Sequence, residues 1–150
     1  MDVRTAFAGA RVGVVGTGAM AEAMVAGMLT MNLVEGSQVC CSHPREERRR
    51  LLTERYGVST AVSNAAAAEG ADVVLLAVKP QVLPAVMPEL KGVLTADQLV
   101  VSVIAGASTH ALGTGLDHPA IVRSMPNTPA QIGQGVTVWF ATGAVTDAQK

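Results

Sequence analysis

Aromatic and charged residues are scarce in this sequence, and each shortage narrows the classes of protein that it can encode. Aromatic residues make up 3% of the 150 residues and charged residues 15%, whereas hydrophobic residues make up 49%. A chain with so many hydrophobic residues is not typical of a disordered protein. Because aromatic residues are scarce, its core must be built from Val, Leu, Ala and Met. Such a mixture is typical of parallel strands that are buried on both faces. The length fits one domain, which we expect to span residues 1–150.

A strong net charge and long apolar runs are also absent from the sequence. The formal net charge is −1, so composition gives no reason to expect nucleic acid or an anionic membrane as a partner. No apolar run has the length of a membrane span, and residues 1–10 lack the long apolar segment of a secretory signal. We therefore expect a cytoplasmic protein in which residues 1–10 form a loose leader.

Metal-ligand spacings and nucleophilic triads are not found either. Cys40 and Cys41 are neighbours in a predicted strand, where they point to opposite faces and cannot form an ordinary disulfide with each other. The three histidines, His43, His110 and His118, are isolated in the sequence. We therefore predict no metal and identify no catalytic residue, and we expect a reducing cytoplasm.

The stretch over residues 11–29 is the most informative part of the chain. Residues 11–15 are rich in Val and predict a buried strand, and residues 20–31 lack proline and predict a helix. Between them, Gly16, Gly18 and Ala21 match the pattern G-x-G-x-x-G/A. The first glycine allows a tight turn, the second lets backbone N–H groups approach a pyrophosphate, and the alanine lets the helix pack closely. Because the helix would point its N-terminus at the phosphate, this stretch predicts dinucleotide binding.

The rest of the chain alternates between predicted strands and helices. One stripe of the first helix is interpreted as a core face, namely Met20, Met24 and Met28. Further strands are predicted at residues 38–42, 58–62, 72–78, 99–104, 120–123 and 135–141, the last as a final or an edge strand. A helix is predicted at residues 44–56, with Pro44 at an early position, and a brief one begins after Ser63 or Asn64 as its cap. Part of residues 81–90 is also predicted to be helical, although Pro84 and Pro88 interrupt or shorten this helix. The last predicted helix runs from Ser108 to about Leu112. This alternation predicts an α/β fold with a doubly wound, mostly parallel sheet of the Rossmann-like, NAD(P)-binding kind.

The residues after the second predicted strand favour NADP over NAD. NAD enzymes usually carry Asp or Glu there, whereas this chain has Ser42, His43 and Arg45, with Arg48 one helical turn further on. A hydroxyl, an imidazole and guanidinium groups suit a 2′-phosphate, because charge-assisted hydrogen bonds contribute about 1.5–3 kcal/mol each. The alternative is a solvated basic helix face over residues 45–50. We therefore predict NADP(H) as the cofactor and keep NAD(H) as an alternative.

Three later segments follow predicted strands at the same carboxyl edge of the sheet, where open α/β sheets bind ligands. Lys79 is placed to meet the cofactor or the substrate, or it is only a solubilising charge. The small residues Ala105 and Gly106 leave room for a nicotinamide ring, or they only form a turn. Residues 125–129 could hold Asn127 as a positioned amide between two prolines.

Taken together, these stretches resemble the pyrroline-5-carboxylate reductase family, which makes proline from its cyclic imine by hydride transfer from NAD(P)H. The ordered segments cover most of the chain: residues 13–24 (GVVGTGAMAEAM), Asn64, residues 71–81 (ADVVLLAVKPQ), residues 100–106 (VVSVIAG) and residues 123–137 (RSMPNTPAQIGQGVT). The resemblance implies that the cofactor is bound by Val15, Gly16, Thr17, Gly18, Ala19 and Met20, by Ser42, His43 and Arg45 at the adenosine phosphate, by Asn64, and by Ala77, Val78, Lys79, Pro80, Ala105 and Gly106. It also implies that the segment with Met125, Pro126 and Asn127 lies near the nicotinamide and the substrate.

The same resemblance implies reduction of 1-pyrroline-5-carboxylate to L-proline, the last step of proline biosynthesis. Family members continue into a helical domain that forms the dimer and supplies most of the imine pocket. The present sequence has a capping-box pattern at residues 146–149, which predicts the start of a helix, and it stops one residue later, within the first turn. We therefore expect a missing dimerisation domain, a chain that binds the cofactor but is inactive alone, and a homo-oligomeric full-length form. The alternative for residues 146–149 is a frayed tail.

Two other functions stay open at this point. One is another reductase with the same cofactor half, such as a β-hydroxyacid dehydrogenase or an imine reductase that acts on a different substrate. The other is a non-catalytic NADP-binding module.

Overall fold

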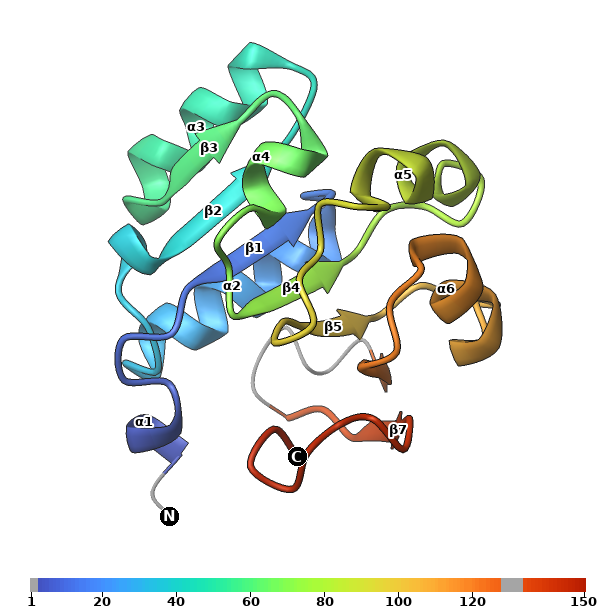
Figure 1. Cartoon of the computed structure of the whole chain (residues 1–150). Coiled ribbons are helices and arrows are strands. Elements are labelled where there is room, and N and C mark those ends of the chain that lie inside the picture. Colours follow the sequence, from blue (N-terminus) through green and yellow to red (C-terminus); the bar gives the residue numbers. More distant parts are fainter. Residues whose placement is uncertain (1–2, 128–133) are drawn as a thin grey trace.

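One sheet of seven strands runs through the described residues, 3–127 and 134–150, of a computed structural model (Figure 1). The strands are β1 (Val12–Val15), β2 (Val39–Ser42), β3 (Ser59–Ala61), β4 (Val73–Leu76), β5 (Leu99–Ser102), β6 (Ile121–Pro126) and β7 (Thr137–Ala141). Their order across the sheet is β3-β2-β1-β4-β5-β6-β7. β7 is antiparallel to β6, and the other pairs are parallel. The predicted doubly wound, mostly parallel α/β fold is therefore confirmed.

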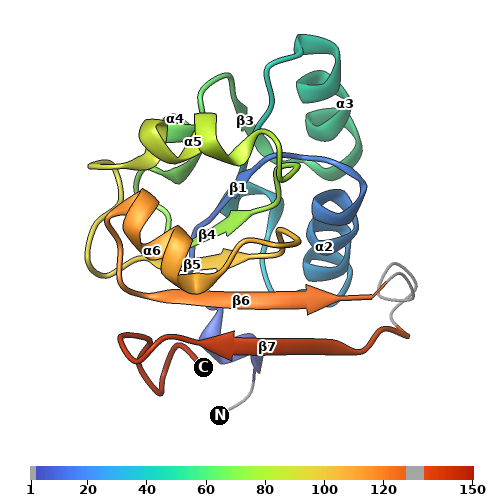
Figure 2. The ribbon, with the colours of Figure 1, turned by 90° about the vertical axis from the view of Figure 1, so that its right-hand side faces the viewer.

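Helices cover both faces of this sheet. They are α1 (Val3–Ala6), α2 (Ala19–Thr30), α3 (Glu46–Tyr56), α4 (Asn64–Ala68), α5 (Leu83–Leu90) and α6 (Thr109–Leu116), with a short 3-10 turn, η1 (Gly36–Gln38), before β2. Figure 2 shows α2 and α3 on one side of the sheet and α4, α5 and α6 on the other. Successive strand residues therefore enter different cores: Val14 and Leu75 pack on the α2 side, whereas Val15 and Leu76 pack on the α5 side.

A glycine in β1 brings α4 close to the sheet. A Cβ atom on Gly13 would overlap the backbone carbonyl of Ala67 in α4, so a larger residue would push the helix away. α4 begins at Asn64 with Ser63 as its N-cap, and the Ser63 hydroxyl accepts a hydrogen bond from the Ala66 N–H at 3.0 Å. This packing holds the N-terminus of α4, with Asn64, beside the carboxyl end of the central strands.

Several predicted boundaries are wrong. α3 begins at Glu46 rather than at Pro44, because Arg45 is extended and serves as the N-cap. For α5 the prediction of a partial helix within residues 81–90 is confirmed, because the helix spans Leu83–Leu90. The prolines do not interrupt it: Pro84 lies in the first turn, where a missing N–H costs nothing, and Pro88 is accommodated in the last turn. α6 runs to Leu116 instead of ending near Leu112.

Two further expectations differ from the structure. β6 extends to Pro126 instead of ending at residue 123, because the antiparallel partner β7 pairs with it from Val122 to Pro126. In α2 the fully buried residues are Ala21 and Val25, while Met24 and Met28 pack at the margin of the core. The face that α2 buries in the core is therefore centred one residue away from the predicted methionine stripe.

The two ends of the chain carry short local structure. α1 lies inside the segment that was expected to be a loose leader. At the other end, the Thr146 N–H donates to Gln149 Oε1 at 2.9 Å and the Gln149 N–H donates to Thr146 Oγ1 at 3.3 Å. The capping-box contacts predicted for these residues are therefore formed. None of the helices in the described residues is long and apolar enough to cross a membrane.

Candidate functional site

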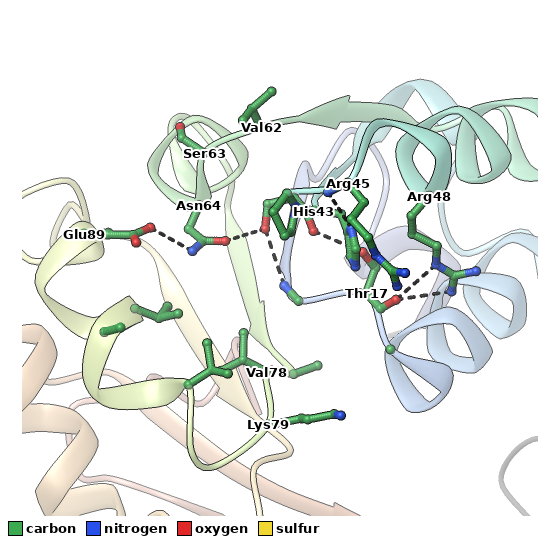
Figure 3. A pocket seen from close by; sticks show the side chains of 18 residues that line it. Thr17, His43, Arg45, Arg48, Val62, Ser63, Asn64, Val78, Lys79 and Glu89 are labelled. Atoms are coloured by element: carbon green, nitrogen blue, oxygen red, sulfur yellow. Dashed lines mark hydrogen bonds between the residues drawn. The ribbon is translucent and has the colours of Figure 1, made fainter.

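A pocket of about 840 Å³ opens at the carboxyl ends of β1, β2 and β4 (Figure 3). This edge is where the strand order reverses, between β1 and β4, and open α/β sheets bind ligands at such a point. The pocket is lined by the glycine turn after β1, the loop after β2, the start of α4, the end of β4 and one face of α5. In the described residues, no group of three or more His, Cys, Asp and Glu side chains could hold a metal ion.

The turn between β1 and α2 needs each of its two glycines for a different reason. Gly16 has φ +84°, and a Cβ atom there would lie 2.6 Å from Val78 Cγ1 and 2.8 Å from the Val78 nitrogen. The turn can therefore press against the end of β4 only without a side chain. Gly18 is the N-cap of α2, and a Cβ atom there would meet nothing within 4 Å. Its missing side chain leaves room in front of the helix N-terminus, where free N–H groups attract an anion.

The Ser42 hydroxyl is turned into the protein rather than toward the basic loop. Ser42 is 1% exposed, and its hydroxyl donates to Asn64 Oδ1 at 2.7 Å while it accepts from the Gly16 N–H at 3.4 Å. The backbone carbonyl of Ser42 also accepts a hydrogen bond from Thr17 Oγ1 at 3.0 Å. The sequence suggested that this hydroxyl meets a 2′-phosphate, whereas the structure uses it to join the glycine turn to α4.

His43 and Arg45 line the pocket in the loop between β2 and α3. The Arg45 N–H donates to His43 Nδ1 at 3.1 Å, and the Arg49 guanidinium holds the His43 carbonyl at 2.8 Å. Partial burial and the positive charge of Arg45 lower the pKa of His43 below its ordinary value. Both this lowered pKa and the hydrogen bond that Nδ1 accepts favour the neutral imidazole, which offers a ligand a hydrogen bond rather than a charge.

Arg48 is committed to a contact inside the protein. Its guanidinium donates to the Thr17 carbonyl at 3.2 Å and forms an ion pair with Glu22 of α2, with side-chain exposures of 23% and 17%. Tyr56 also donates to Glu22, at 2.8 Å, and Arg55 lies 3.2 Å away. Partial burial raises the pKa of Glu22, but the hydrogen bonds from Arg48 and Tyr56 and the nearby positive charges outweigh it, so this pKa lies below its ordinary value.

The distribution of charge in the pocket follows from this ion pair. Arg48 lines the pocket, but Glu22 compensates its charge and its hydrogen bonds stabilise the glycine turn. In the described part of the chain, Arg45 and Lys79 form no ion pair. The sequence did not single out Glu22, and no local signal could have done so, because its partners are 26 to 34 residues away.

The remaining predicted cofactor residues divide into two groups. Ala77, Val78 and Lys79, at the end of β4, line the pocket together with the glycine turn. The pocket lining does not include Val15, Ala19, Met20, Pro80, Ala105 and Gly106. Val15 is buried in the core, whereas Ala105 and Gly106 are exposed after β5.

Sequence reasoning missed one wall of the pocket. It is formed by residues from the start of α4 and from one face of α5: Val62, Ser63, Val82, Ala85, Val86 and Glu89. The spacing of 82, 85, 86 and 89 is a helical stripe that begins just after the predicted strand end, and this signal could have indicated the wall.

Met125, Pro126 and Asn127 lie at the end of β6, away from the pocket lining. Asn127 Oδ1 accepts a hydrogen bond from the Val136 N–H at 2.9 Å, so its side chain links the ends of β6 and β7. Thr128 and Pro129, which complete the predicted segment, lie outside the described residues.

Comparisons with known proteins agree with this geometry. Residues 11–106 match the sequence model of a family described as NADP oxidoreductase, coenzyme F420-dependent. The pyrroline-5-carboxylate reductase of Synechocystis is 37% identical over 93% of this chain and 52% of its own length. A solved structure of a pyrroline-5-carboxylate reductase from Coxiella burnetii is 34% identical with a TM-score of 0.88, over 93% of this chain and 52% of that one. The resemblance predicted from the sequence is therefore confirmed.

A third relative supports the fold. The structure of a Plasmodium falciparum pyrroline carboxylate reductase with NADP bound superposes with a TM-score of 0.81 at 23% identity, over 93% of this chain and 51% of that one. The chain spans about half the length of the curated relatives that it matches.

Proposed function

This chain belongs to the family described as NADP oxidoreductase, coenzyme F420-dependent, and from that premise we propose that it binds NADP(H) in the pocket at the carboxyl ends of β1, β2 and β4. We further propose that residues 1–150 are the cofactor-binding domain of a pyrroline-5-carboxylate reductase. The relatives named pyrroline-5-carboxylate reductase, with identities of 34% and 37%, support this reading.

The observation that carries the choice of cofactor is the position of Arg45. It lines the pocket beside the glycine turn and forms no ion pair in the described residues. No acidic side chain follows β2 at the place where NAD enzymes bind the ribose 2′-hydroxyl. A 2′-phosphate would therefore meet an uncompensated guanidinium and the hydrogen-bonding edge of His43.

The glycine turn also fits the rest of the cofactor. The open space in front of Gly18 accommodates a pyrophosphate against the N-terminus of α2. In this reading Asn64 binds the adenosine half, and Ala77, Val78 and Lys79 border the nicotinamide half. When bound, NADPH supplies the hydride that reduces the substrate.

The substrate in this proposal is a cyclic imine, 1-pyrroline-5-carboxylate. In its protonated, iminium form the C=N carbon accepts the hydride, and the nitrogen keeps its proton as the N–H of the product, proline. This chain's own part is to hold the cofactor and to cover one side of it. We assign no catalytic residue to it. The other half of the relatives' length would supply the remaining imine pocket, and we propose that the complete enzyme is a cytoplasmic homo-oligomer.

Fluorescence titration with NADPH and NADH tests the cofactor assignment. We expect Arg45→Ala to weaken NADPH binding about 10- to 100-fold, the effect of one or two charge-assisted hydrogen bonds, and to leave NADH binding nearly unchanged. Arg50→Ala is the matched control, because Arg50 lies in α3, the helix that Arg45 caps, and pairs with Glu54 away from the pocket. Equal losses for both cofactors in Arg45→Ala, or a preference of the parent chain for NADH, would contradict the assignment.

A second experiment tests the reaction. The chain is fused to the remaining half of the Coxiella burnetii reductase. NADPH oxidation is followed with 1-pyrroline-5-carboxylate, and NADP+ reduction is followed with a β-hydroxyacid as the alternative substrate. We expect turnover with the imine alone. A fusion that binds NADPH and stays inactive with both substrates would favour a non-catalytic NADP-binding module.

A further inference from the structure

Four groups form a continuous chain of hydrogen bonds across the pocket, from α5 to the glycine turn (Figure 3). The Asn64 amide nitrogen donates to Glu89 Oε2 at 2.8 Å, and the Ser42 hydroxyl donates to Asn64 Oδ1 at 2.7 Å. The Gly16 N–H then donates to the Ser42 hydroxyl at 3.4 Å. Glu89 also lines the pocket, on the face of α5 that sequence reasoning missed.

The carboxylate at one end of this chain determines the direction of every hydrogen bond in it. An ionised carboxylate has no proton to donate, so the side of the Asn64 amide that faces Glu89 must be its NH₂ group. The amide oxygen then faces Ser42. The Ser42 hydroxyl has two acceptors within reach, Asn64 Oδ1 at 2.7 Å and the Val14 carbonyl at 3.3 Å, and it gives its single proton to the nearer one, Asn64 Oδ1. The lone pairs of the hydroxyl are left for the Gly16 N–H. A neutral side chain at position 89 would remove this constraint, because an amide can accept as well as donate.

We propose that Glu89 is a positioning residue of the NADP(H) site, which fixes the orientation of the Asn64 amide and, through Ser42, the first N–H of the glycine turn. The proposal rests on the proposed function for its ligand. In the fixed orientation Asn64 has a second N–H beside the pocket, and this donor suits the phosphate and hydroxyl oxygens of a dinucleotide. With the amide reversed, the Asn64 oxygen would no longer face Ser42, and the second Asn64 N–H would no longer be available to a ligand in the pocket.

A simpler role for Glu89 predicts the opposite result. NADPH is a polyanion, so a carboxylate that acts only through its charge repels it, and neutralising that carboxylate would strengthen binding. Positioning predicts that the same change weakens binding. The sign of the effect therefore separates the two roles.

The test compares Glu89→Gln with Glu69→Gln in an NADPH titration. Glu69 is an exposed glutamate at the opposite, amino edge of the sheet, beside the start of β1, so its variant controls for loss of one negative charge. We expect Glu89→Gln to weaken NADPH binding roughly three- to tenfold, the effect of one hydrogen bond, and Glu69→Gln to leave it unchanged. In an Asn64→Ala background, Glu89→Gln should cause no further weakening. The proposal would be overturned if Glu89→Gln alone left NADPH binding unchanged or made it tighter. It would also be overturned if Glu89→Gln weakened NADPH binding as much in the Asn64→Ala background as in the parent chain.

A measurement without the cofactor keeps this inference separate from the proposed function. In ¹H–¹⁵N spectra of the free chain, we expect Glu89→Gln to shift the backbone amide resonance of Gly16, which lies two hydrogen bonds beyond Asn64, while Glu69→Gln does not. A shifted resonance in a chain that fails to bind NADPH would refute the cofactor and leave the hydrogen-bond chain standing. A Gly16 resonance that stays in place would refute the role of Glu89 whatever the titration shows.

Discussion

Replacing Gly16 by alanine should destabilise the fold by an amount that the structure allows us to work out. The φ angle of +84° would cost a residue with a Cβ atom about 1–2 kcal/mol. The new Cβ atom would also lie 2.6, 2.8 and 2.9 Å from Cγ1, N and Cα of Val78. Two of these atoms belong to the backbone just after β4, so they cannot move aside as a side chain could, and such overpacking costs about 1–3 kcal/mol more. We expect the free energy of unfolding to fall by about 2–5 kcal/mol and the melting temperature by about 5–15 °C.

Gly18→Ala is the matched comparison, because it adds the same methyl group two residues away. A Cβ atom on Gly18 would meet nothing within 4 Å, and the cost of alanine at an N-cap is offset by the stiffer unfolded chain to within about 1 kcal/mol. The methyl group would instead enter the space that we assign to the pyrophosphate, so NADPH binding should weaken about tenfold or more.

Thermal unfolding followed by circular dichroism measures the first effect, and NADPH titration well below the melting temperature measures the second. The expected result is a separation, with stability lost in Gly16→Ala and binding lost in Gly18→Ala. A Gly16→Ala protein that melts with the parent would show that the turn can relax away from Val78, and it would refute the geometric reasoning. A Gly18→Ala protein that binds NADPH normally would refute the placement of the phosphate.

Three further results are expected. Arg48→Ala should lower the free energy of unfolding by about 1–3 kcal/mol, because it leaves the Thr17 carbonyl and part of Glu22 without a donor, whereas Arg45→Ala should leave the melting temperature unchanged. In the folded protein the pKa of Glu22 lies below its ordinary value of 4.5. Its contribution to stability is therefore present above pH 4.5 and is lost as the pH falls through the folded pKa. Glu22→Gln should accordingly flatten the acid side of a plot of unfolding free energy against pH. Burial and the neighbouring Cys40 thiol raise the pKa of the Cys41 thiol to about 12. Cys41 should therefore react with a thiol reagent at pH 8 only when the chain unfolds. Fast labelling of Cys41 in the native protein would contradict its burial.

Local chemistry made part of this protein predictable. The strand, glycine turn and helix at the start of the chain carry their signals within about 20 residues, and the required backbone of Gly16 follows from its place in that pattern. Ser108 accepts an N-cap hydrogen bond at the predicted start of its helix, and so does Ser63, one of the two residues after which α4 was predicted to begin; Gly57 ends α3 with φ +67°. Such caps and turns involve neighbours three or four residues apart, which a sequence displays directly.

Other features depend on partners far away in the chain. The sequence placed Arg45 at the adenosine phosphate and Arg48 one helical turn further on, but it could not show that Glu22 pairs with Arg48 and that Arg45 lines the pocket without an ion pair in the described residues. The Ser42 hydroxyl looked like a phosphate ligand, but Asn64 accepts its proton. A side chain's role in each case depends on which of several plausible partners the fold brings within reach.

The sequence by itself determined the fold class, the position of the glycine turn and the edge of the sheet where the pocket opens, because aliphatic runs, glycine spacing and strand–helix alternation are local properties. The tertiary structure alone decided which polar groups form hydrogen bonds or ion pairs within the protein and which remain available to a ligand. Glu22, Glu89 and Asn64 are separated from their partners by 22 to 34 residues. Their contacts exist because the parallel strands bring the loops at their carboxyl ends together.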